Sequence, residues 1–438
     1  MLSLQCREKV LTWDTRTMTP QPVKTITISR TAWMDSPETL TVMMALCGQP
    51  DDQGDEARFV GGCVRDALLN RKVYDIDIAT VFTPEEVIER LTTAKIKAIP
   101  TGIDHGTVTG VVNGHPFEIT TLRCDVETYG RKAKVDYTQD WAKDAKRRDF
   151  TMNALYANIH GEVFDYVDGL NDAQHGIVRF IGDAHHRIEE DVLRILRFYR
   201  FYAHYGRQAI DQDSQAACRD MVKGLAQLSA ERIQTEFLKL LMAENPIPTL
   251  THMKDDGVFN AILQQITQIE TLANLIALET KLDSKTYVIR RLAALIKAEA
   301  QIAADLSTDL KLSNQDQTAL GFLCTSDHDI SDQASDHDIR KKIYETDRDR
   351  VRNMMLLTAA RKGVTADQIE PLYHLATKTR LPRFPMTGDD LLERGVTPGK
   401  TFGNILKTVE TWWIDHDFEP GRTACLEQLD TILQQNQR

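Results

Sequence analysis

The feature that most constrains the fold is a pair of aspartates, Asp75 and Asp77, one residue apart in the segment Val73–Ala79. Apolar side chains alternate with the two carboxylates, which is the two-residue period of a half-buried β-strand. Side chains at positions i and i+2 of a strand leave the same face. We therefore expect both carboxylates to project together and to share hard divalent cations such as Mg²⁺.

Two glycines, Gly61 and Gly62, precede the aspartates and open the segment Val64–Leu69, which has the pattern of a helix start. Small residues at a helix N-terminus let backbone N–H groups approach a phosphate. A phosphate site beside a metal-binding carboxylate pair is the apparatus of nucleotidyl or phosphoryl transfer. A surface strand with two solvated aspartates is the alternative, and the Gly-Gly turn makes that alternative the weaker one.

Length and composition are those of a globular protein of two to four domains, with 438 residues, 42% of them hydrophobic. The net charge of −11 argues weakly against a nucleic-acid partner, although lysine and arginine gather within residues 141–150.

The seven cysteines are scattered without a Cys-x-x-Cys motif, which indicates a reducing compartment. No apolar run approaches the ~20 residues that a membrane span needs. Residues 1–34 are interpreted as an N-terminal extension, disordered or an overlong start, so a cytoplasmic location is expected, with mitochondrial targeting as the alternative.

The pattern of elements changes near residue 183 and predicts the α+β class. Before it, strands and helices alternate; after it, helical spacing predominates to the C-terminus. Local signals predict a strand at 58–60, a capped helix at 83–91, a hairpin of 107–112 with 116–122, and a helix at 230–241. The expected architecture is a catalytic head with a mixed sheet, followed by an all-helical remainder.

A third carboxylate, Glu118, lies on the second strand of the predicted hairpin, with Phe117 and Ile119 pointing the opposite way. Such a group would help to hold metals and to orient an attacking hydroxyl. Two cations ~3.5–4 Å apart can clamp the entering and leaving oxygens of an in-line displacement. A solvated surface glutamate is the alternative interpretation.

Basic and polar residues precede an apolar run in the segment 147–155. Arginine forks bind phosphate oxygens bidentately, which suits Arg148. Asp149 and Asn153 are suited to hydrogen-bond the hydroxyls of a nucleotide's ribose. The alternative is a helix with a polar first turn and solvated arginines.

Residues 190–200 have the pattern of one helix, on which Asp191, Arg194 and Arg197 are spaced three apart along one side. An aspartate acceptor beside an arginine fork matches the amino donor and neighbouring acceptors on cytosine or adenine, and rejects uracil and guanine. Intrahelical salt bridges, worth about 0.3–0.5 kcal/mol per pair, are the alternative.

Taken in order, these motifs resemble those of the class II (bacterial-type) CCA-adding tRNA nucleotidyltransferases, a family of the polymerase-β-like superfamily. The related bacterial poly(A) polymerases share much of the head. Five segments carry the resemblance, which spans about residues 58 to 240: Gly61–Asp66, Asp75–Asp77, Phe117–Arg123, Arg147–Ala154 and Glu190–Arg194. Each motif is modest alone, and the series of five is highly specific.

The resemblance implies that Asp75 and Asp77 bind Mg²⁺ and form the catalytic centre with Glu118. It implies an amino-acid template for CTP and ATP made by Asp191 and Arg194. The other nucleotide-binding positions that it implies are Gly62, Arg65, Arg148, Asp149, Arg197 and Arg200. Arg131 falls in the stretch Tyr129–Val135, where the family has a flexible loop needed for adding the final A. Tyr129 stands where an acidic residue is frequent in that family.

The resemblance also implies a head, neck, body and tail, at residues 35–182, 183–245, 246–375 and 376–438. The implied reaction is the template-independent, metal-dependent addition of CMP, CMP and AMP from CTP and ATP to the 3′ end of tRNA, with release of pyrophosphate. The body and tail are expected to bind the acceptor and T arms of the tRNA. Four alternatives stay open: an enzyme that adds only CC, a poly(A) polymerase, a nucleotidyltransferase for small molecules or proteins, and a non-catalytic RNA-binding protein of the same fold. No membrane partner is expected, and the oligomeric state is left open.

Overall fold

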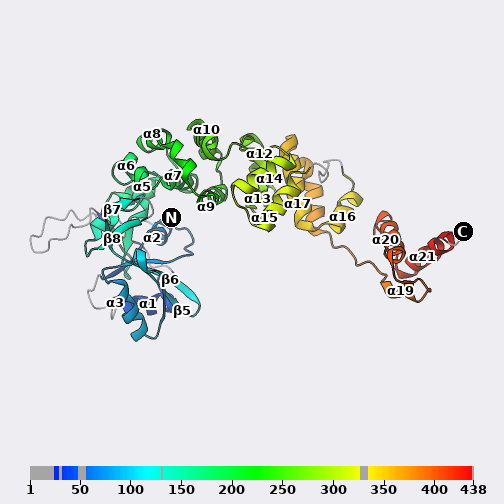
Figure 1. Cartoon of the computed structure of the whole chain (residues 1–438), viewed down its shortest axis with the longest axis horizontal. Helices are drawn as coiled ribbons and strands as arrows, with labels where there is room; N and C mark the ends of the chain where they lie inside the picture. Colours follow the sequence, from blue (N-terminus) through cyan, green and yellow to red (C-terminus); the bar gives the residue numbers. More distant parts are fainter. Residues whose placement is uncertain (1–23, 29–31, 48–55, 130–131, 326–333, 437–438) are drawn as a thin grey trace, which may run out of the picture. The chain divides into compact units, whose positions relative to one another are not determined.

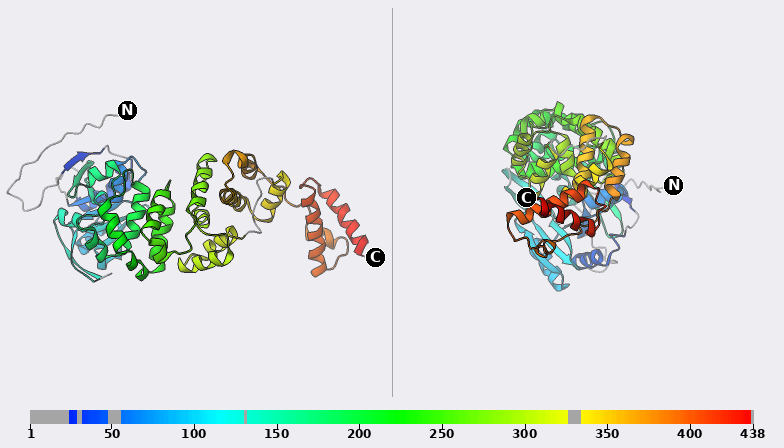
Figure 2. Two further views of the ribbon diagram at one scale, coloured as in Figure 1. Left: turned by 90° about the horizontal axis from the view of Figure 1, so that it is seen from above. Right: turned by 90° about the vertical axis from the view of Figure 1, so that its right-hand side faces the viewer.

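The computed structural model describes residues 24–28, 32–47, 56–129, 132–325 and 334–436 (Figure 1). The chain divides into two compact units, residues 1–262 and 263–438. All the described strands belong to the first unit, in the blue to cyan part of the ribbon, and the green to red part consists of helices and their connections (Figure 2). The predicted α+β class, with a mixed sheet in the head and a helical remainder, is confirmed.

An eight-stranded mixed sheet forms the centre of the first unit. Its strand order is β1 (Lys24–Thr27), β10 (Glu162–Asp165), β9 (Leu155–Ala157), β2 (Ala57–Val60), β3 (Asp77–Thr80), β6 (His115–Thr121), β5 (Thr107–Val112) and β4 (Lys97–Gly102). Among the described pairs of strands only β3 and β6 run parallel, and this pairing sets Asp77 beside Glu118. A separate two-stranded sheet consists of β7 (Arg123–Tyr129) and β8 (Lys132–Tyr137).

Local signals account for the elements that the sequence predicted well. Helix α3 (Pro84–Thr93) begins with a capping box, in which the Thr83 side chain and the Glu86 side chain satisfy each other's backbone N–H groups. The β5–β6 hairpin turns at Asn113 and Gly114, with φ values of 50° and 82°. This left-handed pair is the backbone that an Asn-Gly turn favours, so the predicted hairpin is confirmed.

Helices cover the sheet and complete its core. α1 (Pro37–Cys47) and α3 pack against each other and against β5, while α2 (Gly62–Leu68) packs on β2 and β9. α4 (Trp141–Lys146) contributes Trp141 and Ala145 to a buried cluster with Val60 and Tyr156. The short helix α5 (Gly169–His175) packs on the 3₁₀ turn at Thr151–Asn153. The arginine-rich segment 147–150 is therefore held between buried elements.

The predicted start of the strand that carries the two aspartates is wrong. β3 begins at Asp77, and Asp75 precedes it in the irregular segment 71–76. The reason is tertiary: Phe59 on β2 pairs with Ile78, but Gly61 then turns away into α2 with φ 72°, so no strand remains beside residues 73–76. Within the predicted extension, Lys24–Thr27 form β1 on β10, while residues 1–23 lie outside the described residues.

The rest of the first unit is helical. It consists of α6 (Ala184–Glu190), α7 (Leu193–Tyr205), α8 (Gln212–Asp220), a 3₁₀ helix at Val222–Gln227, α9 (Ala230–Leu241), α10 (Ile247–Asp255) and α11 (Val258–Ile262). The helix predicted at 230–241 is confirmed as α9, which packs along α7. The prediction of one helix across residues 190–200 is wrong, because Asp191 lies in a break between α6 and α7. There its carboxylate accepts a hydrogen bond at 3.1 Å from the N–H of Leu193, the first residue of α7.

The second unit is built of helices α12 (Ile269–Lys281), α13 (Val288–Ala294), α14 (Ala300–Asp309), α15 (Asn314–Leu323), α16 (Asp336–Glu345), α17 (Arg348–Lys362), α18 (Ala366–Lys378), α19 (Gly388–Leu392), α20 (Lys400–Asp415) and α21 (Arg422–Asn436). α12 packs along α17, and Trp413 is buried in a core shared by α19, α20 and α21. None of the described helices is long and apolar enough to cross a membrane. The division into head, neck, body and tail stays a prediction.

Candidate active site

The acidic centre lies where β3 and β6 run side by side. Asp77 is the first residue of β3, and its register partner on β6 is Glu118. Burial, and then the negative charge of Glu118, raise the pKa of Asp77 to about 6. The charge of Arg148 opposes this shift and that of Asp75 adds to it. Three acidic groups therefore act on one another here, as the sequence predicted, although Asp75 lies outside the strand.

These carboxylates fit a divalent cation, because mutual repulsion and burial leave negative charge that a cation would stabilise. In the described part of the chain no group of three or more His, Cys, Asp or Glu side chains stands ready-made to enclose a metal. A magnesium ion does not require such a cage. It keeps several waters and is usually bound by one or two carboxylates together with substrate phosphates.

A cavity of about 1350 Å³ opens from the acidic centre. Five of the predicted site residues line it: Asp77, Glu118, Arg148, Asp191 and Arg194. Asp77 and Glu118 come from the sheet and Arg148 follows α4, whereas Asp191 lies in the break between α6 and α7 and Arg194 lies in the first turn of α7. The volume is large enough for a nucleoside triphosphate by the standards of ligand sites. One cavity thus joins a carboxylate pair to arginine guanidinium groups and a further carboxylate from other parts of the chain.

Arg148 is fixed in place by a buried network. Its guanidinium donates to Asp144 at 3.0 Å and to the Tyr156 hydroxyl at 3.1 Å, and that hydroxyl donates to Asp144 at 2.7 Å. Burial acts to raise the pKa of Asp144, but Arg148 and then Arg147 outweigh it and hold that pKa at about 2. A Cβ on Gly61 would stand 3.8 Å from Arg148 Nη1, so the bare glycine backbone passes close to this guanidinium. A charge held this rigidly is pre-organised for an anionic ligand.

Arg65 and Asn153 lie behind the cavity instead of lining it. Arg65 is 6% exposed and donates to Asp66, to the amide oxygen of Asn153 and to the Tyr205 hydroxyl at 2.6 Å. Gly62, the first residue of α2, is half-buried beside it. The polar atoms of Arg65 are thus already engaged, and direct contact of these residues with a nucleotide stays a prediction.

Asp149, Arg197 and Arg200 form a second layer of ion pairs. Asp149 accepts from Arg197 Nε at 2.8 Å. Burial alone would raise the pKa of Asp149, yet the charge of Arg197 lowers it. Glu236 of α9 accepts from Arg200 at 2.5 Å and lies 3.8 Å from Arg197. Arg194 and Arg197 lie three residues apart on α7 as predicted, but Asp191 precedes that helix, so the predicted helical stripe does not include it.

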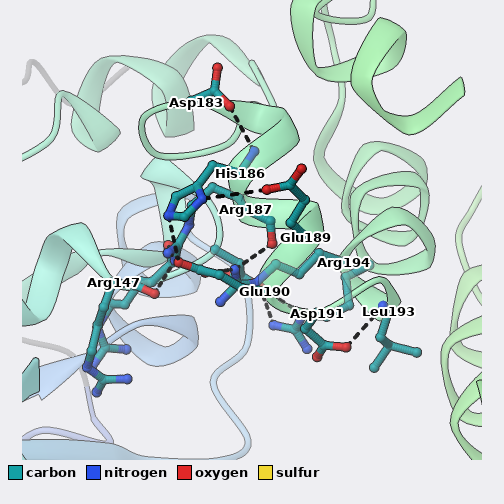
Figure 3. Close-up of polar contacts among 12 residues, drawn as sticks. Arg147, Asp183, His186, Arg187, Glu189, Glu190, Asp191, Leu193 and Arg194 are labelled. Carbon is teal, nitrogen blue, oxygen red and sulfur yellow. Dashed lines mark hydrogen bonds and ion pairs between the residues drawn. The ribbon is translucent and has the colours of Figure 1, made fainter. Parts of the chain in front are cut away.

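The proposed base-reading pair is held by partners that the sequence analysis missed. Asp191 accepts from Arg232 of α9 at 2.7 Å. Arg194 donates to Glu190 and to the Arg187 carbonyl at 2.7 Å (Figure 3). Glu190 could have been found, since it stands four residues before Arg194, where helical side chains meet. Arg232 gives no local signal, because it comes from another helix. Arg131 lies outside the described residues.

Family models match two parts of the chain. Residues 57–179 match the model described as Poly A polymerase head domain. Residues 209–270 match the model described as Probable RNA and SrmB- binding site of polymerase A. The first match contains the carboxylates and Arg148, and the second contains Arg232.

Named relatives align over most of the chain. The CCA tRNA nucleotidyltransferase 1, mitochondrial, of Danio rerio is 33% identical over 396 residues, which cover 85% of this chain and 87% of the relative. The CCA-adding enzyme of Lactobacillus delbrueckii subsp. bulgaricus is 30% identical and covers 90% of this chain and 98% of its own length. A crystal structure of the Bacillus stearothermophilus CCA-adding enzyme in complex with CTP matches with a TM-score of 0.71 and 25% identity, covering 91% of this chain and 98% of that one.

Proposed function

We propose that this chain, which belongs to the CCA tRNA nucleotidyltransferases and is thus an enzyme of a metal-dependent family, adds CMP, CMP and AMP to the 3′ end of tRNA. CTP and ATP are the nucleotide substrates and pyrophosphate is released. The observation that carries the proposal is the single cavity that joins Asp77 and Glu118 to Arg148 and to Asp191 with Arg194. The alignment covers most of the length of both relatives and not only the catalytic head. This supports the proposal that the chain carries out the complete reaction.

We propose Mg²⁺ as the metal, with Asp75 and Asp77 as its ligands and Glu118 beside them. When bound, such an ion lowers the pKa of a primer hydroxyl and stabilises a pyrophosphate leaving group. Asp77 must be ionised to serve as a ligand, and its pKa of about 6 leaves it mostly ionised at neutral pH. No separate general base is required from the protein.

Nucleotide recognition is divided between the two sides of the cavity. Arg148, fixed by Asp144 and Tyr156, is proposed to bind the triphosphate. Asp191 is proposed to accept from the amino group of cytosine or adenine, and Arg194 to donate to the acceptor beside it. Uracil and guanine present the opposite pattern at this edge, so both nucleotides are rejected.

The remaining predicted residues are proposed to support this site. Gly62 and Arg65 hold the start of α2 below the phosphates, and Asp149 with Asn153 lies toward the ribose. Arg197 and Arg200 add positive charge behind the base-reading pair. Residues 246–375 and 376–438 are proposed as the body and tail that bind the acceptor and T arms of tRNA. A cytoplasmic location is proposed, with mitochondria as the alternative suggested by the named relatives.

The test uses a tRNA that lacks its 3′ trinucleotide, incubated with the protein, Mg²⁺ and all four nucleoside triphosphates. Sequencing of the tRNA ends is expected to show CCA and no further extension. Ends that stop at CC would identify a CC-adding enzyme, and runs of A would identify a poly(A) polymerase. Asp77→Ala is expected to abolish incorporation while tRNA binding remains. RNA binding without any incorporation by the unaltered protein would refute the proposal.

A further inference from the structure

Arg187 of α6 connects two parts of the cavity wall that serve different parts of a nucleotide. Its side chain is 7% exposed, and it is not among the residues that line the cavity. Nη2 donates to the main-chain carbonyls of Arg147 and Arg148, the latter at 2.5 Å. Nη1 donates to Glu190 Oε2 at 2.6 Å (Figure 3). One guanidinium thus ties the backbone that carries Arg148 to the carboxylate at the end of α6.

Glu190 carries the connection on to Arg194. The same oxygen, Oε2, accepts from Arg187 and from Arg194 Nη1, and Arg194 also donates to the Arg187 carbonyl at 2.7 Å. Two guanidinium groups share one carboxylate, so the trio keeps net positive charge. Nε and Nη2 of Arg194 make no hydrogen bond to any described residue. Arg194 therefore keeps both charge and donors for a ligand.

The position of Arg187 is not one that stability alone would favour. Burial, and then the charge of Arg194, lower the pKa of Arg187. Its Nε is buried and has no hydrogen-bond partner among the described residues. Buried unsatisfied donors are rare in native proteins and often mark a functional constraint. The repulsion between the buried positive charges of Arg187 and Arg194 is a second unfavourable contribution to stability.

We infer that Arg187 is a positioning residue that couples base selection to phosphate contact, an inference that rests on the proposed function. By engaging Glu190 it keeps that carboxylate from neutralising Arg194. By engaging the carbonyls of Arg147 and Arg148 it sets the base-reading residues at a fixed distance from the Arg148 guanidinium. The preference for CTP and ATP over UTP and GTP depends on Arg187, although this residue touches no nucleotide.

The test compares Arg187→Met with the unaltered protein in steady-state incorporation of the first nucleotide on tRNA ending at the discriminator base. The ratio of kcat/KM for CTP to that for UTP is expected to fall at least tenfold, because Glu190 is then free to pair fully with Arg194. The dissociation constant for tRNA is expected to stay within twofold. A ratio within twofold of the unaltered protein's would overturn the inference.

A double variant separates the charge effect from a merely structural one. In Arg187→Met/Glu190→Gln the neutral amide cannot neutralise Arg194, so the CTP-to-UTP ratio is expected to recover at least threefold over Arg187→Met. Absence of recovery would overturn the inference. Arg187→Gln is the second variant should the methionine protein not fold, with the same expected fall and the same threshold.

Arg219→Met is the matched control. Arg219 lies on α8 in the same unit and donates to the buried carboxylate of Asp256 at 2.8 Å, outside the cavity lining. Its loss should lower the melting temperature without changing the CTP-to-UTP ratio, and an equal fall in that ratio would overturn the inference. CTP and UTP affinities, measured by calorimetry on the same proteins, give the ratio independently of incorporation. A failure of the proposed function therefore remains distinguishable from a failure of this inference.

Discussion

Asp77, as the proposed cation ligand, would make cation binding depend on pH, because only its ionised form can be a ligand. Its pKa of about 6 exceeds the ordinary aspartate value, so the folded protein holds this proton more tightly than the unfolded chain does. Without a cation, the contribution of this proton to folding stability is lost as the pH rises through about 6. We predict that affinity for Mn²⁺, measured by calorimetry between about pH 5 and pH 8, rises up to about pH 7 and then levels off.

The neighbouring carboxylate provides the control for that pH dependence. After burial, the charge of Glu118 is the largest cause that raises the pKa of Asp77. Glu118→Gln should therefore move the midpoint of the Mn²⁺ titration to lower pH. Asp77→Asn should remove the pH dependence near 6 altogether. A midpoint that stays in place in Glu118→Gln would contradict the assigned cause.

Arg232 offers a second prediction at the level of single residues. It donates to Asp191 at 2.7 Å, and both side chains are partly exposed, so we assign the bond about 1 kcal/mol. Arg232→Met should weaken CTP binding about three- to tenfold and leave tRNA binding unchanged, as measured by calorimetry. Lys239→Met, an exposed cation on the same helix, is the control. Equal loss in both variants would indicate a general charge effect and not positioning.

The sequence predicted residue types better than it predicted their partners. Asp77, Glu118 and Arg148, predicted as site residues, line one cavity. Arg65 and Arg197 were predicted as nucleotide contacts, yet each guanidinium is engaged by Asp66 or Asp149. A sequence motif shows that an arginine is present, whereas the partner of that arginine depends on how distant segments pack. The spacing of neighbouring residues does not predict this packing.

At the scale of elements, the reliable predictions were those with local causes. The Thr83 cap and the Asn113–Gly114 turn act within a few residues, and the structure contains both. The start of β3 and the break at Asp191 were mispredicted because distant elements decide them. β2 ends where Gly61 turns, and the Asp191 carboxylate accepts from the Leu193 N–H at the start of α7 and from Arg232 of α9.

Helix α5 gives a prediction about backbone packing. A Cβ on Gly169 would lie 2.0 Å from the Thr151 carbonyl oxygen. Because this oxygen belongs to the backbone, it cannot move away without a large free-energy cost. Gly169→Ala should destabilise the first unit by several kcal/mol, seen as a lower melting temperature in calorimetry. Gly321→Ala in α15 meets nothing within 4 Å and should stabilise by about 1 kcal/mol. The same sign in both variants would contradict the steric account.

At the scale of the whole molecule, the proposed function requires an acidic protein to bind an acidic RNA. The net charge of −11 means that contact depends on local cations. Arg383 lies in the predicted tail region, is exposed, and makes no ion pair with any described residue. Arg383→Ala should weaken tRNA binding and lower the slope of log affinity against log salt by about 1. Filter binding at several salt concentrations measures both quantities.

Arg394 is the matched control for that experiment. Its guanidinium donates to Asp430 at 2.6 Å, so much of its charge is already compensated. Arg394→Ala should leave the salt slope unchanged, and CTP affinity should be the same in both variants. A salt slope that is unaltered in Arg383→Ala would remove this residue from the tRNA-binding surface.

The parallel pairing of β3 with β6 has a consequence for how the enzyme is made. Asp77 and Glu118 become neighbours only after α3, β4 and β5 have been threaded between them. A nascent polypeptide still missing β6 therefore carries one half of its acidic centre and cannot assemble it on the ribosome. The cavity also takes Arg148, Asp191, Arg194 and Arg232 from later in the chain, so the complete site forms only after residue 232 has been made.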